Sequence, residues 1–209
     1  MNLRNCLIYI GLALLGSSCK TNKNIKTGDI VFRGATTSKL SSAINEVTQT
    51  QAKNNYTHMG ICEVANKTTY VYHADYNKGV VKELLNEFIK SDNKEYYNVD
   101  LYRIKSLKKD DINKAIKQAK TWVGNPYNTT YILEDEGFYC SEYVYEVFKT
   151  DSIFGLEPMT FKDPKTNKFH NGWIEHYKVL GIPIPEGKLG CNPNKMASSN
   201  NLIFIKTIN

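Results

Sequence analysis

The sequence has few cysteines, and none of them form a CxxC pair. Five cysteines are spread over 209 residues, so neither a zinc knuckle nor a dithiol redox motif is predicted. The excess of basic over acidic residues is modest, with a formal net charge of +6, and no basic stripe carries interleaved aromatics. The chain is therefore not expected to bind nucleic acid.

Long apolar runs, low-complexity blocks and internal repeats are also missing. The chain is long enough for one well-filled core, so a single domain is expected. The apolar run at residues 6–15 is too short for a comfortable membrane span. It follows Arg4 and precedes the small residues at 16–18, an order typical of a cleaved export signal.

Cys19 directly follows these small residues. Its position resembles a bacterial lipoprotein signal, in which residues 1–18 are removed, Cys19 is lipidated and residues 19–27 form a tether. The usual leucine three places before the cysteine is here Gly16, so an ordinary secretory signal is the alternative. The lipoprotein interpretation predicts a protein anchored to the membrane of the bacterial cell envelope, on its periplasmic or outer-membrane face.

Lipidation of Cys19 would leave three thiols, those of Cys62, Cys140 and Cys191. An odd number of thiols in an exported protein predicts at least one reactive free thiol.

Helical and strand patterns alternate along residues 28–209 and predict one α+β domain. Strands are expected at residues 28–34, 56–64, 69–74, 100–104 and 201–208. Helices are expected at residues 38–50, from a cap at Asp110 or Asp111 to residue 123, and onward from about Cys140. Residues 155–200, rich in Pro, Gly and Asn, are predicted to wrap the core as a long ordered loop.

Cys140 lies at the start of one predicted helix. Cys140, Val144 and Val147 recur at i, i+4 and i+7, so one helical stripe carries the thiol. Unsatisfied backbone N–H groups and the positive end of the helix dipole favour a thiolate there, which predicts a depressed pKa and a nucleophile. A buried core cysteine is the alternative, because free cysteine is among the most buried residue types.

Two histidines are predicted to share one face of a β-hairpin. If Asn66-Lys67 forms the turn, His58 faces Asp75 and lies diagonal to His73, with Gly60 leaving open space between the two histidines. A base near a thiol, oriented by a third polar group, is what cysteine catalysis needs. A half-buried or surface position remains the alternative for each histidine, and a slip of one residue would separate them.

Five segments in this order resemble a known family. They read GDIVF at 28–32, YTHMGI at 56–61, VYHA at 71–74 with GVV at 79–81, GNPY at 124–127 and YCSE at 139–142. Together they resemble the permuted NlpC/P60 papain-like cysteine hydrolases of the YiiX/YebB type. The resemblance covers almost the whole chain from residue 28 onward and implies a papain-like fold in permuted order.

By this resemblance Cys140 is the nucleophile, His58 the base and His73 the third member of the triad. Relatives more often carry Glu at the position of His73, and a second histidine there resembles the lecithin:retinol acyltransferase group. Asp75 is the reserve candidate for the third role.

The resemblance also implies substrate contacts near the nucleophile. Tyr127 is expected to donate a hydrogen bond to the substrate or the oxyanion, together with the backbone N–H of Cys140. A turn aromatic packed on the core is the alternative for Tyr127. Ser141, Glu142 and Asp75 are expected to contact the substrate.

The resulting prediction is an exported cysteine peptidase or amidase that acts on a small peptide or amide, such as a peptidoglycan fragment. The cleft is expected to be polar, because its predicted edges are Asn54, Asn55, Tyr56, Asn125, Tyr127, Asn128, Thr129 and Thr130.

Three alternatives remain: a lipid acyltransferase or thioesterase, a non-catalytic binding module, and a zinc site at His58, His73 and Cys140. No cofactor and no metal are expected, and His170 and His176 are predicted to be surface or packing residues.

Overall fold

The computed structural model describes residues 24–34, 39–52, 54–90 and 97–208. The predicted export signal, Cys19 and the first part of the tether lie outside the described residues. Among the helices that are described, none has the length and apolar character needed to cross a bilayer.

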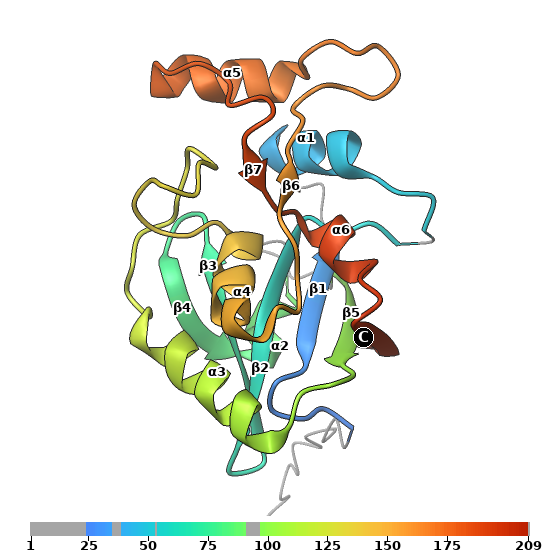
Figure 1. Ribbon diagram of the computed structural model, residues 1–209, viewed down its shortest axis with the longest axis vertical. Coiled ribbons are helices and arrows are strands. Elements are labelled where there is room, and N and C mark those ends of the chain that lie inside the picture. The colour runs from blue at the N-terminus through green and yellow to red at the C-terminus, as the bar shows by residue number, and fades with distance from the viewer. Residues whose placement is uncertain (1–23, 35–38, 53, 91–96, 209) are drawn as a thin grey trace, which may run out of the picture.

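A six-stranded antiparallel sheet forms the centre of the molecule (Figure 1), in the order β4-β3-β2-β1-β5-β8. Together with the helices it forms the predicted α+β fold. Its strands are β1 (Ile30–Gly34), β2 (His58–Ala65), β3 (Thr68–Asp75), β4 (Gly79–Leu84), β5 (Asn98–Ile104) and β8 (Leu202–Ile208).

The β2–β3 hairpin has the predicted turn and register. Asn66 and Lys67 both have positive φ, 49° and 64°, as a two-residue turn that follows the sheet twist requires. Cys62 pairs with Val71 across the strands, the register expected from that turn. Strand β4 was not predicted, and it continues the meander after a second tight turn.

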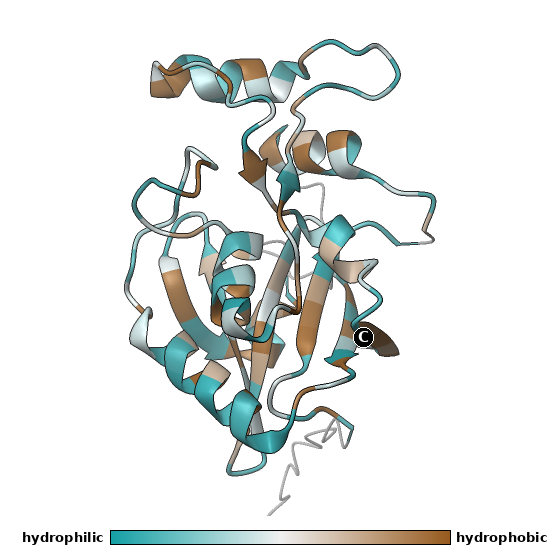
Figure 2. Ribbon diagram, in the orientation of Figure 1, coloured by the Kyte–Doolittle hydropathy of each residue, from teal (hydrophilic) through white to brown (hydrophobic). Residues whose placement is uncertain are grey.

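The two faces of the sheet carry separate hydrophobic cores. One face contributes Ile30, Phe32 and Met59 to the larger core, which also includes α4 side chains. The opposite face contributes Val31 and Cys62 to a smaller core, closed by α2 (Leu85–Phe88). Strand β1 is accordingly hydrophobic along most of its length, as Figure 2 shows.

Helices α3 (Lys109–Thr121) and α4 (Cys140–Val147) cover the larger core. The prediction that Asp110 or Asp111 caps α3 was wrong, because Lys108 is the N-cap residue and both aspartates lie in the first turn. Their charges still favour that end of the helix, where the dipole is positive.

The predicted long loop at 155–200 contains helices α5 (Asn171–Leu180) and α6 (Pro193–Ala197), and a short β6–β7 pair at Glu157–Pro158 and Leu189–Gly190. The side chain of His170 accepts a hydrogen bond from the Gly172 amide and caps α5, which ends at Gly181 with φ 69°. Polar residues and glycines here lie at helix ends. From its composition alone, such a segment is predicted to be a loop.

Helix α1 (Lys39–Thr48), α5 and the β6–β7 pair lie together beyond one end of the sheet (Figure 1). This end is also where α4 begins and where β2 starts.

Candidate active site

Cys140 is the first residue of α4, and the Glu142 side chain holds the start of that helix. The Glu142 carboxylate accepts a hydrogen bond from the backbone N–H of Tyr139, the N-cap residue, at 3.0 Å. The Cys140 side chain is buried at 5 % exposure, and its thiol donates to the Thr57 carbonyl at 4.0 Å. The nucleophile candidate therefore contacts the residue that directly precedes His58.

Burial raises the pKa of Cys140 to about 11, although the N–H groups of Ser141 and Met59 and the Arg33 guanidinium lower it. The prediction of a depressed pKa was wrong, because loss of hydration outweighs the helix N-terminus and the nearby cation. Burial raises the pKa of Cys191 to about 12 and that of Cys62 further still. Cys140 is the most acidic of the three described thiols, yet it is protonated at neutral pH.

The structure brings His58 and His73 together. The Nε2 atom of His58 lies 2.8 Å from Nδ1 of His73, and the two rings meet edge to face at 89°. A Cβ atom at Gly60 would come within 3.0 Å of the His73 Cβ and 2.5 Å of a Val71 methyl group. The space that we expected at Gly60 is therefore filled by the neighbouring strand, and glycine permits this close approach.

Glu83 holds the other side of His73, a residue that the sequence analysis missed. Its carboxylate lies 2.9 Å from Nε2 of His73. Glu83 pairs with Val71 across β3–β4, which puts it on the same sheet face as His73 and diagonal to it. The turn after Asp75 and the β-forming pair Val80-Val81 were the available signal, but no strand was predicted there.

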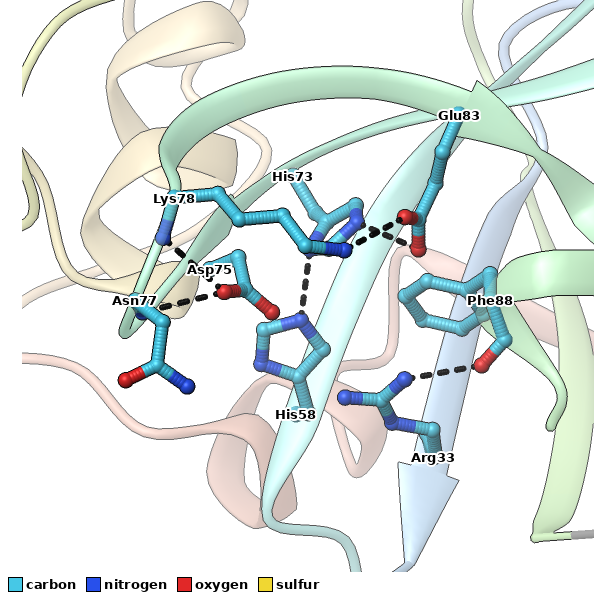
Figure 3. A network of polar contacts seen from close by, with 8 residues as sticks. All are labelled: Arg33, His58, His73, Asp75, Asn77, Lys78, Glu83 and Phe88. Atoms are coloured by element: carbon cyan, nitrogen blue, oxygen red, sulfur yellow. Dashed lines mark hydrogen bonds and ion pairs between the residues drawn. The ribbon is translucent and has the colours of Figure 1, made fainter. Parts of the chain in front are cut away.

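These contacts define one consistent set of proton positions (Figure 3). Burial lowers the pKa of both His58 and His73, so both rings are neutral. Burial works against ionisation of Glu83, but its bond with His73 holds its pKa below the ordinary value. The carboxylate accepts from Nε2–H of His73, whose Nδ1 accepts from Nε2–H of His58. The Nδ1 atom of His58 is then left unprotonated and able to act as a base.

The histidines and the thiol approach from opposite faces of the sheet. Both imidazole rings pack on Phe88 of α2, whereas α4 contributes Val144 to the core on the other face. They approach each other at the start of β2, around Thr57. Among the described residues, no hydrogen bond joins the Cys140 thiol to either ring.

Asp75 lies on the face of the two histidines, as expected, but its hydrogen bonds are to the backbone. Its Oδ1 accepts from the backbone amides of Asn77 and Lys78, at 3.0 and 3.1 Å, and so holds the β3–β4 turn (Figure 3). His73, and not the reserve candidate Asp75, shares the hydrogen bond with His58.

A cavity of about 240 Å³ opens beside the thiol. Cys140, Ser141 and Tyr127 line it together with apolar side chains from α1, the β6 region and α5, among them Ile44, Val47, Pro158, Met159, Phe161 and Trp173. The predicted edge residues were wrong, since Tyr127 alone of the eight lines this cavity. Its polar lining comes from other residues, among them Thr48, Gln49, Thr160 and Asn192. Asn54 and Tyr56 instead bind the Asp100 carboxylate, each at 2.6 Å.

Two tyrosine hydroxyls lie at the Cys140 end of the cavity. Those of Tyr127 and Tyr131 are 3.3 Å apart. Burial raises the pKa of each, and negative charge on Cys140 raises it further, so both remain neutral donors. Tyr131 has φ 58°, a left-handed conformation that strains a bulky residue and often marks a functional site. No local sequence pattern predicts this conformation.

Ser141 and Glu142 have mainly structural contacts. The Ser141 hydroxyl donates to the Cys191 carbonyl at 3.0 Å. The Glu142 carboxylate is buried under the α4 start, where it also accepts from the Asn128 amide at 3.2 Å, and it is not among the side chains that line the cavity. Glu142 therefore positions the nucleophile helix rather than the substrate.

The remaining histidines also have structural contacts. His170 caps α5 and lies 3.0 Å from the Glu46 carboxylate, while Nε2 of His176 lies 2.7 Å from the Thr129 carbonyl. Both are packing and capping residues, as predicted.

The described residues contain no group of three or more His, Cys, Asp or Glu side chains arranged to hold a metal ion. The zinc hypothesis at His58, His73 and Cys140 does not fit this geometry. One nitrogen of each imidazole is used in the bond between the two rings, and the second nitrogen of His73 is bonded to Glu83.

The fold and the site define a class of protein, and comparison with known families agrees. The chain belongs to the permuted papain-like amidases of the YaeF/YiiX, C92 family, whose model matches residues 24–206. The match extends over both histidines and the cysteine.

The individual relatives are YiiX proteins. The chain is 33 % identical over 126 residues to the uncharacterized protein YiiX of Escherichia coli K12, a stretch that covers 59 % of this chain and 57 % of the relative. The matched region therefore spans little more than half of that relative. A crystal structure described as the metalloprotein YiiX from Escherichia coli O157:H7 superposes with a TM-score of 0.72 at 23 % identity, over 88 % of this chain and 97 % of the other. The predicted permuted papain-like fold is confirmed.

Proposed function

We propose that this chain is a cysteine amidase in which Cys140 is the nucleophile, His58 the base and His73 the residue that orients the base. The observation that carries the proposal is the hydrogen-bond chain Glu83–His73–His58. It leaves one imidazole nitrogen unprotonated on the residue next to the carbonyl that receives the Cys140 thiol. The family description as amidases supports the reaction class.

The reaction follows from these proton positions. Nδ1 of His58 takes the thiol proton while the Cys140 sulfur attacks the amide carbon, forming the C–S bond. The N–H of Cys140 and the Tyr127 hydroxyl stabilise the oxyanion. His58 then gives the proton to the leaving nitrogen as the C–N bond breaks. Water, deprotonated by His58, attacks the thioester. The C–S bond then breaks to release the acid, and His58 returns the proton to the Cys140 sulfur.

The resting pair is a neutral thiol and a neutral imidazole in this proposal. Burial holds the pKa of Cys140 at about 11 and that of His58 well below its ordinary value. Proton transfer is therefore coupled to the attack rather than completed beforehand. Catalytic hydrogen bonds often shorten only when substrate is bound, which accommodates the separation between thiol and ring.

The proposed substrate is chosen to fit the cavity beside Cys140. We propose that one side of the scissile amide carries an apolar group which fills the space between Met159, Phe161 and Trp173. Burial of each methylene there would stabilise the complex by about 0.8 kcal/mol. The proposed substrates remain peptides of cell-wall type. The protein would reach them at the bacterial envelope, anchored through lipidated Cys19.

The apolar cavity also favours a second candidate, the transfer or hydrolysis of fatty acyl esters or thioesters by the same residues. Seven of the eight polar residues that had argued against an acyl chain do not line this cavity.

Parallel assays decide between the candidates. Protein lacking residues 1–18 is incubated with muropeptides, with N-acyl amino acids of increasing chain length and with the matching acyl esters, and Cys140→Ala is the control. Turnover of amides that depends on Cys140 supports the proposal, and turnover of esters alone selects the second candidate. Absence of any turnover would favour a non-catalytic binding module. Met159→Gln, which keeps side-chain length, should slow only the substrates with long chains.

A further inference from the structure

Arg33 lies beside the histidine pair and has no role in the mechanism so far. It is on β1 and pairs directly with His58 across β1–β2. Its guanidinium lies between two aromatic rings, 4.7 Å from the centre of Phe88 and 4.6 Å from that of Tyr97. One of its terminal nitrogens donates to the Phe88 carbonyl at 2.8 Å. Figure 3 shows the guanidinium next to the His58 ring.

The surroundings of this cation are unusual. Its Nε atom is buried without a hydrogen-bond partner in the described part of the chain, where the guanidinium is held by two rings and a carbonyl oxygen. Such an arrangement has a desolvation cost. The carboxylates of Glu83 and Asp75 act on the guanidinium, and its own field in turn reaches the neighbouring site.

We propose that Arg33 is an electrostatic positioning residue, whose charge keeps the proton off the His58–His73 pair and stabilises negative charge on Cys140. This inference deepens the proposed function and rests on it. In this proposal Arg33 acts on the site through its charge, in addition to its contacts with Phe88 of α2.

The Arg33 charge should lower the pKa of His58 and also that of Cys140. A nearby cation disfavours a protonated imidazole and favours a thiolate. In agreement, Arg33 contributes, after burial, to the lowered pKa of His58. It also opposes the effect of burial on the pKa of Cys140. Removal of the charge should raise both pKa values, which moves the whole pH window of the reaction upward.

Other charged groups face the same site and must be held constant. Glu83 from β4, with Lys78 bound to it at 3.6 Å, and Asp75 from β3 all lie on this side of the sheet. Tyr127 and Tyr131 face Cys140 from the loop before α4. None of these is changed in the variants below.

The test is the pH dependence of Cys140 alkylation by iodoacetamide, measured by peptide mapping in wild type, Arg33→Met and Arg33→Lys. The reaction needs no substrate, so its outcome is independent of whether amide cleavage is found. In Arg33→Met we expect the midpoint to rise by about one pH unit. In Arg33→Lys, which retains the charge, we expect the wild-type midpoint. A purely structural role would change the amount of folded protein but not this midpoint.

Lys82→Met is the matched control. Lys82 is also a cation over two rings, 4.1 Å from the centre of Tyr70 and 5.4 Å from that of Tyr72, but it binds Glu63 rather than facing the thiol. Its removal should leave the midpoint unchanged.

An unshifted midpoint in folded Arg33→Met overturns the proposal, as does an equal shift in Arg33→Lys. Should Arg33→Met fail to fold, the same measurement on Arg33→Gln, whose amide can still donate to the Phe88 carbonyl, takes its place. A nitrogen NMR titration of the wild-type imidazoles is the second readout and needs no variant. Protonation of His58 at or above about pH 6.5, the ordinary histidine value, would likewise refute the proposal.

Discussion

His58 and His73 share one hydrogen bond, 2.8 Å long, between Nε2 of the first ring and Nδ1 of the second. The group that orients the base is therefore itself an imidazole, and a carboxylate, Glu83, lies one bond further along. A neutral second histidine can orient the first ring without placing a full negative charge beside it. The charge of Glu83 acts through His73 instead.

This order of contacts predicts a graded mutational series. His58→Ala should abolish turnover, because proton transfer typically contributes about 10²–10⁴-fold. His73→Ala should lower kcat by about 10–100-fold, since orientation is a separate contribution. Glu83→Gln should have a smaller effect. Asp75→Asn should have the smallest, because its amide oxygen can still accept both turn bonds and, within the described part of the chain, Asp75 forms no hydrogen bond to either histidine. Steady-state kinetics on one substrate, with circular dichroism as a check on folding, measures the series. A larger loss from Asp75→Asn than from His73→Ala would contradict it.

The pKa of Cys140, raised by burial to about 11, predicts how the thiol labels. Its reaction with iodoacetamide should still accelerate as pH rises through 9 and 10, without a plateau at neutral pH. It should also exceed that of Cys191 and Cys62, whose pKa values burial raises further. Peptide mapping after limited labelling gives all three rates. A plateau near pH 7 would indicate a preformed thiolate–imidazolium pair, and faster labelling of Cys62 would contradict the choice of nucleophile.

Buried Glu142 should make stability depend on pH. Burial raises its pKa from the ordinary 4.5 to about 8, so between these values the native state keeps a proton that the unfolded chain has lost. The free energy of unfolding should therefore fall as pH rises through this window, by up to about 1.4 kcal/mol per pH unit from this one group. Below pH 4.5 both states are protonated and the dependence ends.

Urea denaturation of wild type and Glu142→Gln across pH 4–9 isolates this contribution, since every other titrating group is common to both. Glutamine can still accept the Tyr139 N–H bond but cannot ionise. An identical pH dependence in the two proteins would show that Glu142 is ionised in the native state.

The lipoprotein hypothesis concerns residues outside those that the structure describes. Cys19→Ser should leave the protein uncleaved or move it from the membrane fraction to the soluble fraction, because the acylated thiol would be missing. Fractionation with immunoblotting, and mass spectrometry of the mature N-terminus, make the measurement. Mature, cleaved Cys19→Ser protein that stays in the membrane fraction would argue against lipidation.

The histidine pair could be predicted because its geometry is local. Asn66-Lys67 fixes the turn, the turn fixes the register, and the register determines which side chains share a face. Glu83 follows the same rule through the next turn, and it was missed only because residues 79–84 had not been recognised as a strand.

The cavity could not be predicted in this way. Its apolar wall comes from α1, the β6 region and α5, three segments far apart in the sequence whose packing no local pattern fixes. The raised pKa of Cys140 could not be predicted either. The helix start was predicted correctly, but the loss of water around the thiol depends on the whole fold. Tyr131, whose backbone is left-handed, likewise packs against Trp173, a residue distant in the sequence.

The two-residue turn between β2 and β3 also affects the order in which the site is assembled. His58 and His73 are joined by a short hairpin, whose loop closes early and at small entropic cost. Cys140 comes from a distant helix and depends on contacts of much longer range, which form later in folding. The base and its partner should therefore be in place before the nucleophile docks. Pulse-labelling hydrogen exchange during refolding, with β2–β3 amides protected ahead of those in α4, would reveal this sequence, and a chain interrupted before α4 would hold a paired imidazole with no thiol to activate.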